Sequence, residues 1–352
     1  MNHDVAAAMN NWFRNDGAYV LVDGQWGSTG KGVIAAAMAE CFADRVDTNI
    51  TNAAPNSGHT FYTGAGKKVV LKQLPTFAVA SMYHTHDAPR IAISGGAAVD
   101  FDTLGREVLE HKVSPPDVHP FAAVIGPEEK SEDTVNVKRV ASTGQGVGPA
   151  FIRKMQRGAH RNQGSVGYDW SVRNMGGVVF FEVSQGFSLG INSGHYPWVT
   201  SRECTVSQAL ADAGFPPNKH RKTVMSLRSL PIRVGNTEGT SGPCYPDQRE
   251  LTWEEVGQEP ELTTVTKRVR RIFTWSNTQF IHAIKANCPD VLFLNFMNYV
   301  PEDDRPEFLD NVVDAYRNVL GRDPVLLLGW GPKSSDITLY TYRVTSSISN
   351  PP

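Results

Sequence analysis

The sequence predicts an α/β fold, in which a single large domain over residues 1–352 carries a mostly parallel central sheet flanked by helices. Three observations lead to this prediction: short continuous apolar runs recur along the chain, helix-like stretches separate them, and a glycine-rich turn follows the first run. The sequence of a strand that helices cover on both faces is an uninterrupted run of apolar residues. Such folds bind their ligands at the carboxyl ends of the strands.

The elements alternate along the chain. The run AYVLV at 18–22 predicts the first strand, and VIAAAMAECFA at 33–43 predicts the helix after it. IAISGGAAV at 91–99 predicts another strand, which a helix over 103–112 follows. Later apolar runs predict further strands at 121–125, 176–183, 291–296 and 324–330.

Composition indicates an ordinary globular protein. A chain with 40% hydrophobic and 20% charged residues buries a substantial core, and the polar segments 127–138 and 236–250 are predicted to be surface excursions. The formal net charge of −2 gives no basic footprint, so we expect no nucleic-acid partner. The start lacks the pattern of a signal peptide, and no apolar run reaches the length of about 18 residues that a membrane helix needs. We therefore expect a soluble, cytoplasmic protein without a membrane partner.

The strongest local signal is the segment VDGQWGSTGKG, where the first strand enters a glycine-rich turn. Glycines let backbone N–H groups approach phosphate oxygens, the following helix adds a positive end, and Lys31 supplies a charge. The spacing differs from the common P-loop, because five residues separate Gly24 from Gly30 and Gly32 stands where Ser or Thr would bind magnesium. A strand-to-helix turn without a ligand is the alternative.

Two more segments carry polar groups in turns. NSGHT places His59 between Gly58 and Thr60, where an exposed loop histidine is the plain alternative. ASTGQGVGPAFIRKMQRG sets hydroxyls before a glycine turn and basic residues on a predicted helix, a combination that suits a second phosphate. A basic helix face taken alone is more often only solvated.

The later part of the chain offers groups for a purine and for a dicarboxylate. Gln185, Gly186 and Asn192 lie in an irregular stretch that ends at Thr200, and amides can donate to and accept from a purine edge. TTVTKRVRRIF at 263–273 gathers four basic residues that could pair with carboxylates, although a lone charge run usually marks a surface.

Together these segments resemble the adenylosuccinate synthetase family from about Val20 to about Lys333. The family's GDQWGDEGKG is similar to DGQWGSTGKG here, and its NAGHT to NSGHT. Its TTGRGIGPAY, GAQG, YPYVTSSN and TGRPRR are matched in order by STGQGVGPAF, VSQG, YPWVTSRE and TKRVRR. The resemblance implies a P-loop-related synthetase fold and one catalytic domain.

The resemblance also implies a two-step ligase reaction. A triphosphate phosphorylates O6 of a purine nucleotide, and the amine of L-aspartate then displaces that phosphate at C6. Ser28, Lys31, His59 and Gln185 are implied to be the catalytic residues, with Mg²⁺ as cofactor on Ser28 and the Gly58 carbonyl. A homodimer is implied as well, in which Arg157 reaches the partner's monophosphate site.

The resemblance also implies which residues bind each substrate. Those implied for the triphosphate are Gly27, Ser28, Thr29, Gly30, Lys31, Gly32, Gly58, His59, Thr60, Asn298, Gly331 and Pro332. Those implied for the nucleotide monophosphate are Ser28, Asn56, Ser142, Thr143, Arg157, Gln185, Asn192 and Thr200. Those implied for aspartate are Thr266, Arg268 and Arg270.

Ser28 departs from the family, which has a catalytic aspartate at this position. A hydroxyl of ordinary pKa cannot replace that carboxylate as a base. The smaller side chain leaves room for a 2-amino group beside N1 of the purine, which indicates guanine instead of hypoxanthine. A bacteriophage branch of the family, which converts dGMP, aspartate and ATP to N6-succino-2-amino-2′-deoxyadenylate, shares GSTGKG, and a viral member would act in the host cytoplasm.

Asn298 is the second departure, because the family reads the guanine of GTP with an aspartate there. One amide oxygen cannot accept both guanine donors as a carboxylate does, so we expect ATP or dATP as the phosphoryl donor. A strand end without base contact is the alternative at this position. For the whole chain, the alternatives are a conventional synthetase that uses IMP and GTP, and a non-catalytic nucleotide-binding protein.

Overall fold

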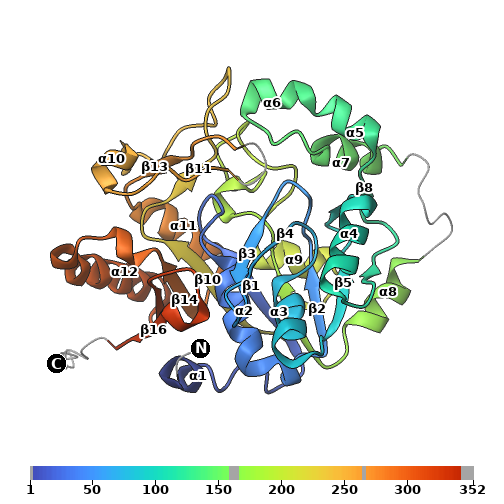
Figure 1. The fold of residues 1–352 in the computed structure, drawn as a ribbon, viewed down its shortest axis with the longest axis horizontal. Helices are drawn as coiled ribbons and strands as arrows, with labels where there is room; N and C mark the ends of the chain where they lie inside the picture. The colour runs from blue at the N-terminus through green and yellow to red at the C-terminus, as the bar shows by residue number, and fades with distance from the viewer. Residues whose placement is uncertain (1–2, 158–165, 264–266, 342–352) are drawn as a thin grey trace, which may run out of the picture.

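A nine-stranded sheet forms the centre of the computed structural model, which describes residues 3–157, 166–263 and 267–341 (Figure 1). The strand order is β16-β15-β14-β10-β1-β9-β2-β5-β7, and the pairs are parallel except for β15 and β16. The strands are β1 Gly17–Asp23, β2 Thr48–Thr51, β5 Arg90–Ile93, β7 Asp117–Val118, β9 Val178–Glu182, β10 His220–Arg228, β14 Val291–Asn295, β15 Val325–Gly329 and β16 Ile337–Tyr340.

Strand β1 shows why apolar runs form this sheet. All seven of its residues are buried, and successive side chains point to opposite faces. Tyr19 and Leu21 belong to one hydrophobic core, while Val20 and Val22 belong to the other. A strand between two cores has no polar face, so its sequence is continuously apolar.

Helices cover both faces of the sheet. The first core takes residues from α1 His3–Ala8, α2 Lys31–Phe42, α3 Thr76–Thr85 and α4 Phe101–His111. The second takes residues from α8 Gly167–Asn174, α9 Val206–Asp212, α11 Asn277–Asn287 and α12 Arg305–Leu320. No helix in the described part of the chain is long and apolar enough to cross a membrane.

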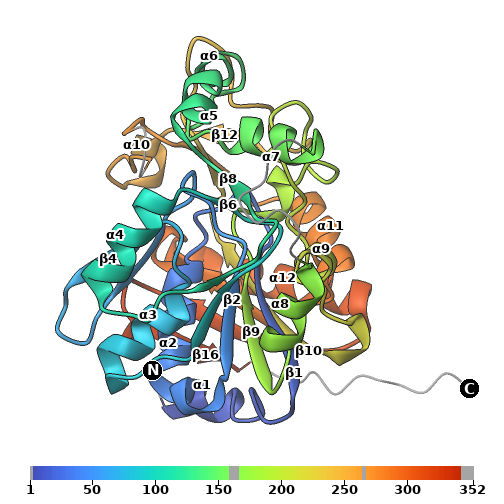
Figure 2. The same cartoon turned by 90° about the vertical axis from the view of Figure 1, so that its right-hand side faces the viewer.

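Two excursions rise beyond the carboxyl ends of the central strands, and both views place them at the same end of the molecule (Figures 1 and 2). One contains α5 Pro127–Glu132, α6 Thr134–Val140 and α7 Val147–Met155. The other contains β11 Ile232–Arg233, β12 Glu250–Leu251, α10 Trp253–Val256 and β13 Arg271–Phe273. Smaller paired strands are β3 His59–Tyr62 with β4 Lys68–Leu71, and β6 Ala98–Val99 with β8 Ala123–Val124.

The predicted fold class is confirmed, and three segments differ in detail. The run 91–99 is divided between β5 and β6 by a turn, and only the short β8 forms within 121–125. The polar segment 127–138 is helical, not merely an excursion. Pro127 begins α5, and the Glu129 carboxylate accepts a 2.7 Å hydrogen bond from Gly126 N, so polar residues cap and start the helix.

Candidate active site

A cavity of about 630 Å³ opens beyond the carboxyl ends of the central strands. Residues from segments that are distant in sequence line it. They include the glycine turn 26–33, the segment 56–60, Thr143, Gln185, the residues 261–263, Arg270, Asn295, Phe296, Asn298, Tyr299, Gly331 and Pro332. The sheet therefore brings most of the predicted segments to one place, where α/β folds bind ligands.

The glycine turn has a backbone that only small residues allow. Gly27 and Gly30 have φ of 89° and 97°, in the left-handed region. A Cβ on Gly30 would lie 2.1 Å from Asn295 Nδ2, and one on Gly32 would lie 2.4 Å from the Thr60 carbonyl oxygen. Helix α2 can therefore begin directly at the cavity wall. Ser28, with φ of 58°, is exposed to the cavity in this turn.

Lys31 is held by a buried carboxylate that sequence reasoning missed. Its Nζ donates to Asp23 Oδ2 at 3.1 Å and to the Gln185 carbonyl oxygen at 2.7 Å. Asp23 also accepts from Thr29 Oγ1 at 2.6 Å and from Gly27 N at 3.2 Å. One carboxylate thus shapes the turn and positions its lysine. The sequence carried a signal for this role of Asp23, because it is an acidic residue at the end of an apolar strand and directly precedes the glycine turn.

His59 begins β3 and is buried in the cavity wall. Burial, followed by the positive charges of Lys31 and Arg202, lowers the pKa of His59 to about 3. In this environment the imidazole is neutral near pH 7, so it can act by donating an N–H bond and not as a cation. Beside it, the buried Oδ1 of Asn56 has no hydrogen-bond partner within the described residues.

Gln185 follows β9 with φ of 67°, and it lines the cavity while its carbonyl holds Lys31. The next residue must be small, because a Cβ on Gly186 would lie 2.4 Å from the Gln25 carbonyl oxygen. The close approach of this loop to the glycine turn joins the predicted purine-facing residue to the predicted phosphate site.

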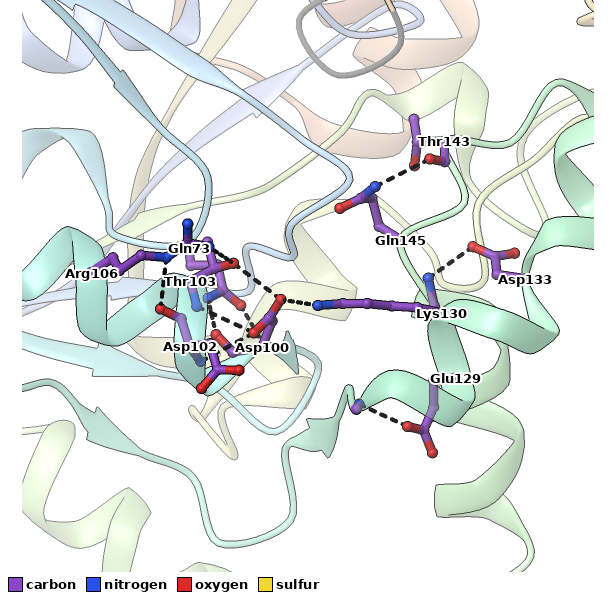
Figure 3. Close-up of polar contacts among 12 residues, drawn as sticks. Gln73, Asp100, Asp102, Thr103, Arg106, Glu129, Lys130, Asp133, Thr143 and Gln145 are labelled. Carbon is purple, nitrogen blue, oxygen red and sulfur yellow. Dashed lines mark hydrogen bonds and ion pairs between the residues drawn. The ribbon is translucent and has the colours of Figure 1, made fainter.

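The turn before α7 places only one of its two hydroxyl residues at the cavity. Thr143 lines the cavity, whereas Ser142 Oγ lies 3.5 Å from Asp133 Oδ2. The same carboxylate oxygen accepts a 2.9 Å bond from Gly146 N, as Figure 3 shows in the surroundings of Asp133. Asp133 therefore fixes the turn from behind.

Neighbouring contacts tie this excursion to the body of the protein. Lys130 Nζ donates to Asp100 Oδ2 at 2.7 Å, and Asp100 caps α4 (Figure 3). Arg153 pairs with Glu128 at 2.9 Å, and Lys154 Nζ donates to the Gly95 carbonyl oxygen at 2.6 Å. The prediction that this basic face suits a phosphate is therefore not supported for Arg153 and Lys154, because protein oxygens hold both cations.

Four residues predicted for the nucleotide monophosphate do not line the cavity. Ser142 faces Asp133, as described, and Thr200 N donates to the Leu189 carbonyl oxygen at 2.7 Å. Asn192 is exposed. Arg157 is also exposed and follows α7, outside the cavity of its own chain. The predicted residues Ser28, Asn56, Thr143 and Gln185 do line it.

Of the residues predicted to bind the substrate aspartate, too, only some line the cavity. Arg270 lines the cavity, and burial lowers its pKa to about 10. Arg268 is half-buried and does not line the cavity, and Thr266 lies outside the described residues. Arg271 Nε donates to Glu250 Oε1 at 2.7 Å, which explains why this neighbouring arginine is not available to the cavity.

The predicted donor pocket contains Asn298, Gly331 and Pro332, all of which line the cavity. Sequence reasoning missed the aromatic residues beside them. Phe296 and Tyr299 also line the cavity, and the guanidinium carbon of Arg228 lies 3.6 Å from the centroid of the Phe296 ring. An aromatic wall suits a nucleobase, because every base has a face that can stack.

Within the described residues no group of three or more His, Cys, Asp or Glu side chains could hold a metal ion. Ser28 and Gly58, the residues predicted for Mg²⁺, both line the cavity. Their oxygens are the hard ligands that Mg²⁺ accepts, together with water and substrate phosphates.

Comparison with known proteins finds relatives that match most of the chain. A family model described as adenylosuccinate synthetase matches residues 167–301. The N6-succino-2-amino-2′-deoxyadenylate synthase of Vibrio phage phiVC8 is 36% identical over 343 residues, which cover 91% of this chain and 97% of that protein.

Two solved structures share the fold. The cyanophage S-2L succinoaminodeoxyadenylate synthetase bound to dGMP and dATP has a TM-score of 0.79 and 32% identity, and covers 93% of this chain and 96% of its own. The Plasmodium falciparum adenylosuccinate synthetase has a TM-score of 0.72 at 18% identity, over 92% of this chain and 99% of its own. The chain therefore belongs to the family of adenylosuccinate synthetases and their phage N6-succino-2-amino-2′-deoxyadenylate synthase relatives.

Proposed function

We propose that this protein joins L-aspartate to C6 of dGMP and thereby forms N6-succino-2-amino-2′-deoxyadenylate. O6 of the base attacks the γ-phosphorus of ATP or dATP, and the nucleoside diphosphate leaves. The aspartate amine then attacks C6 and displaces phosphate. The observation that carries this proposal is one cavity that unites the Lys31 turn, His59, Gln185 and Arg270, with Ser28 in place of a carboxylate. The cytoplasm is the proposed place of action.

Phosphoryl transfer mainly requires positioning and charge stabilisation. Lys31 and the N-terminus of α2 supply positive potential at the cavity wall. His59, neutral because burial lowers its pKa to about 3, is proposed to donate an N–H bond to the oxygen of the transferring phosphate. Gln185 is proposed to contact the purine near O6.

Ser28 is proposed to select a 2-amino purine. Its side chain is exposed in the cavity and its backbone is fixed in the left-handed region between Gly27 and Thr29. A hydroxyl there leaves more room beside N1 and C2 than a carboxylate does, and it adds no negative charge. The similarity to a synthetase bound to dGMP and dATP supports this assignment.

Mg²⁺ is proposed as the cofactor, at a site where the protein supplies few ligands. Mg²⁺ is usually bound through one or two protein oxygens and the substrate phosphates, without a dedicated protein cage. The Ser28 hydroxyl and the Gly58 carbonyl, both at the cavity, are the proposed protein ligands. When bound, the ion would neutralise charge on the phosphates.

Aspartate is proposed to bind through its carboxylates to the loop over 261–270. Arg270 lines the cavity, and Arg268 and Thr266 precede it by two and four positions in the sequence. A homodimer is proposed to complete the monophosphate site, because Arg157 is exposed and lies outside the cavity of its own chain.

The experiment that tests the function measures aspartate-dependent release of phosphate with IMP, GMP and dGMP, each with ATP. We expect the highest kcat/KM with dGMP, and mass spectrometry should show the succino-nucleotide product. A preference for IMP would support the conventional synthetase reaction. Nucleotide binding without aspartate-dependent phosphate release would support a non-catalytic protein.

A further inference from the structure

Arg228, at the end of β10, contacts three residues of the cavity wall, which are Ser28, Phe296 and Glu261. Its side chain is fully buried, and its Nε donates to the Leu230 carbonyl oxygen at 2.9 Å. Its Nη1 lies 3.5 Å from the carbonyl oxygen of Ser28 in the glycine turn. Its guanidinium stacks on the ring of Phe296. None of the assigned substrate contacts uses this arginine.

The fourth contact of Arg228 is the Glu261 carboxylate, and that contact uses both carboxylate oxygens. Arg228 Nη1 donates to Oε2 at 3.2 Å, while Nη2 donates to Oε1. Tyr299 adds a hydroxyl bond to Oε1 at 3.0 Å. Burial alone would raise the pKa of Glu261, but the charge of Arg228 and the hydrogen bonds from Arg228 and Tyr299, together with the charge of Arg270, lower it overall, so Glu261 stays ionised.

Glu261 is also the carboxylate that acts on Arg270, since its charge raises the pKa of Arg270 against the lowering by burial. Yet within the described residues the structure gives the Arg270 guanidinium no ion pair and no side-chain hydrogen bond. Arg270 N donates instead to the Glu261 backbone carbonyl at 2.8 Å, so the two residues face each other across the loop. The Arg270 side chain is only partly buried at the cavity wall, so an anionic ligand in the cavity can pair with it.

We infer that Arg228 is a positioning residue that holds Glu261 away from Arg270 and so keeps Arg270 free to bind a carboxylate of the amino-acid substrate. This inference rests on the proposed function. Glu261 lies nine residues before Arg270 in one loop and would otherwise be a permanent intramolecular competitor for its guanidinium. A bidentate pair with Arg228, which the Phe296 ring fixes in orientation, removes that competitor.

The test is the substitution Arg228→Met, alone and together with Glu261→Gln, in the full-length protein. Loss of Arg228 frees Glu261 to pair with Arg270, so KM for aspartate should rise at least about tenfold, as for the loss of one hydrogen bond to a charged group. The added Glu261→Gln removes the competing charge and should return KM to within about threefold of wild type. A purely structural role for Arg228 predicts lower stability in denaturant unfolding, while the KM of the folded protein for aspartate stays unchanged.

Glu250→Gln is the matched control, because Glu250 on β12 pairs with Arg271, the neighbour of Arg270 at the start of β13. Its KM for aspartate should stay near the wild-type value. Unchanged KM in Arg228→Met, or a raised KM that Glu261→Gln does not relieve, would overturn the inference. If Arg228→Met does not fold, Glu261→Gln alone decides: a KM within about threefold of wild type is expected, and a rise of tenfold means that Glu261 itself binds aspartate.

The two proposals can fail separately. Calorimetric binding of dGMP should be the same in wild type, Glu261→Gln and Glu250→Gln, because neither substituted residue is assigned to it. Wild-type protein that forms no aspartate-dependent product from dGMP contradicts the proposed function. Active wild-type protein with an unrelieved Arg228→Met contradicts only the role of Arg228.

Discussion

The Lys31 ammonium lies 3.1 Å from the Asp23 carboxylate, and both side chains are buried at the start of the cavity wall, with exposed fractions of 6% and 0%. The pair orients the Lys31 ammonium at the cavity wall before any ligand binds. Because Asp23 also accepts from Thr29 and from Gly27 N, the turn and its cation form one unit.

Asp23→Asn should destabilise the protein by about 3 kcal/mol, since it leaves the buried charge of Lys31 without its partner. In the double variant with Lys31→Met both charges are absent, so its loss of unfolding free energy should be smaller than the sum of the single losses. Denaturant unfolding of the four proteins measures this difference. Additive losses would show that the two side chains are not energetically coupled.

Ser28→Asp should reduce turnover of dGMP by about 100-fold and give measurable use of IMP, because the added carboxylate meets the 2-amino side of guanine but not hypoxanthine. Steady-state kinetics with both nucleotides gives the comparison. Ser28→Ala is the control for loss of the hydroxyl alone. Normal dGMP turnover by Ser28→Asp would refute this account of specificity.

The donor should be ATP or dATP, used at least as well as GTP, because Asn298 at the cavity lacks the carboxylate that accepts both guanine donors. Asn298→Asp should raise kcat/KM for GTP about tenfold, as expected for a new charged hydrogen bond. Kinetics with the three triphosphates tests this. A strong preference of the wild-type protein for GTP is the contrary result.

Titration of His59 should make the protein less stable in acid. The unfolded histidine takes up a proton near pH 6.5, whereas the folded one does so only near its lowered pKa of about 3, so unfolding gains protons in this window. Stability should therefore fall as pH drops from about 6.5 towards 3. His59→Gln should flatten that part of the curve, while His84→Gln on the exposed surface of α3 is the control. Equal slopes in both variants would show that His59 does not contribute.

His59→Asn should also abolish product formation with either purine nucleotide, because its proposed bond is to the transferring phosphate. Binding of dGMP, measured by calorimetry, should remain. Substantial product from this variant would remove His59 from the mechanism.

Shared active sites should be visible as complementation. Mixed Arg157→Leu and Lys31→Ala proteins should form hybrid dimers in which one active site has both residues intact, so some activity should return. Native mass spectrometry would verify subunit exchange. Exchange without recovery of activity would mean that Arg157 serves its own subunit or none.

The sequence by itself determined the fold class, the glycine turn and the family. The apolar runs predicted β1, β5, β9, β14 and β15, because strands buried on both faces have no polar positions, but β2 and β10 were not predicted. The glycine turn was also readable, since the left-handed backbone at Gly27 and Gly30 requires glycine locally. Ser28 and Asn298 were recognised as departures from motifs contained in short segments.

Only the tertiary structure decided which side chains meet. Lys31 and Gln185 are 154 positions apart, and Arg228 and Glu261 are 33 apart, so neither contact leaves a local pattern. The basic residues of one segment are alike in sequence, yet Arg270 faces the cavity while Glu250 from another strand holds Arg271. Charge partners are set by the packing of distant loops, and therefore sequence predicts that a cation is present but not whether it is free to bind a substrate.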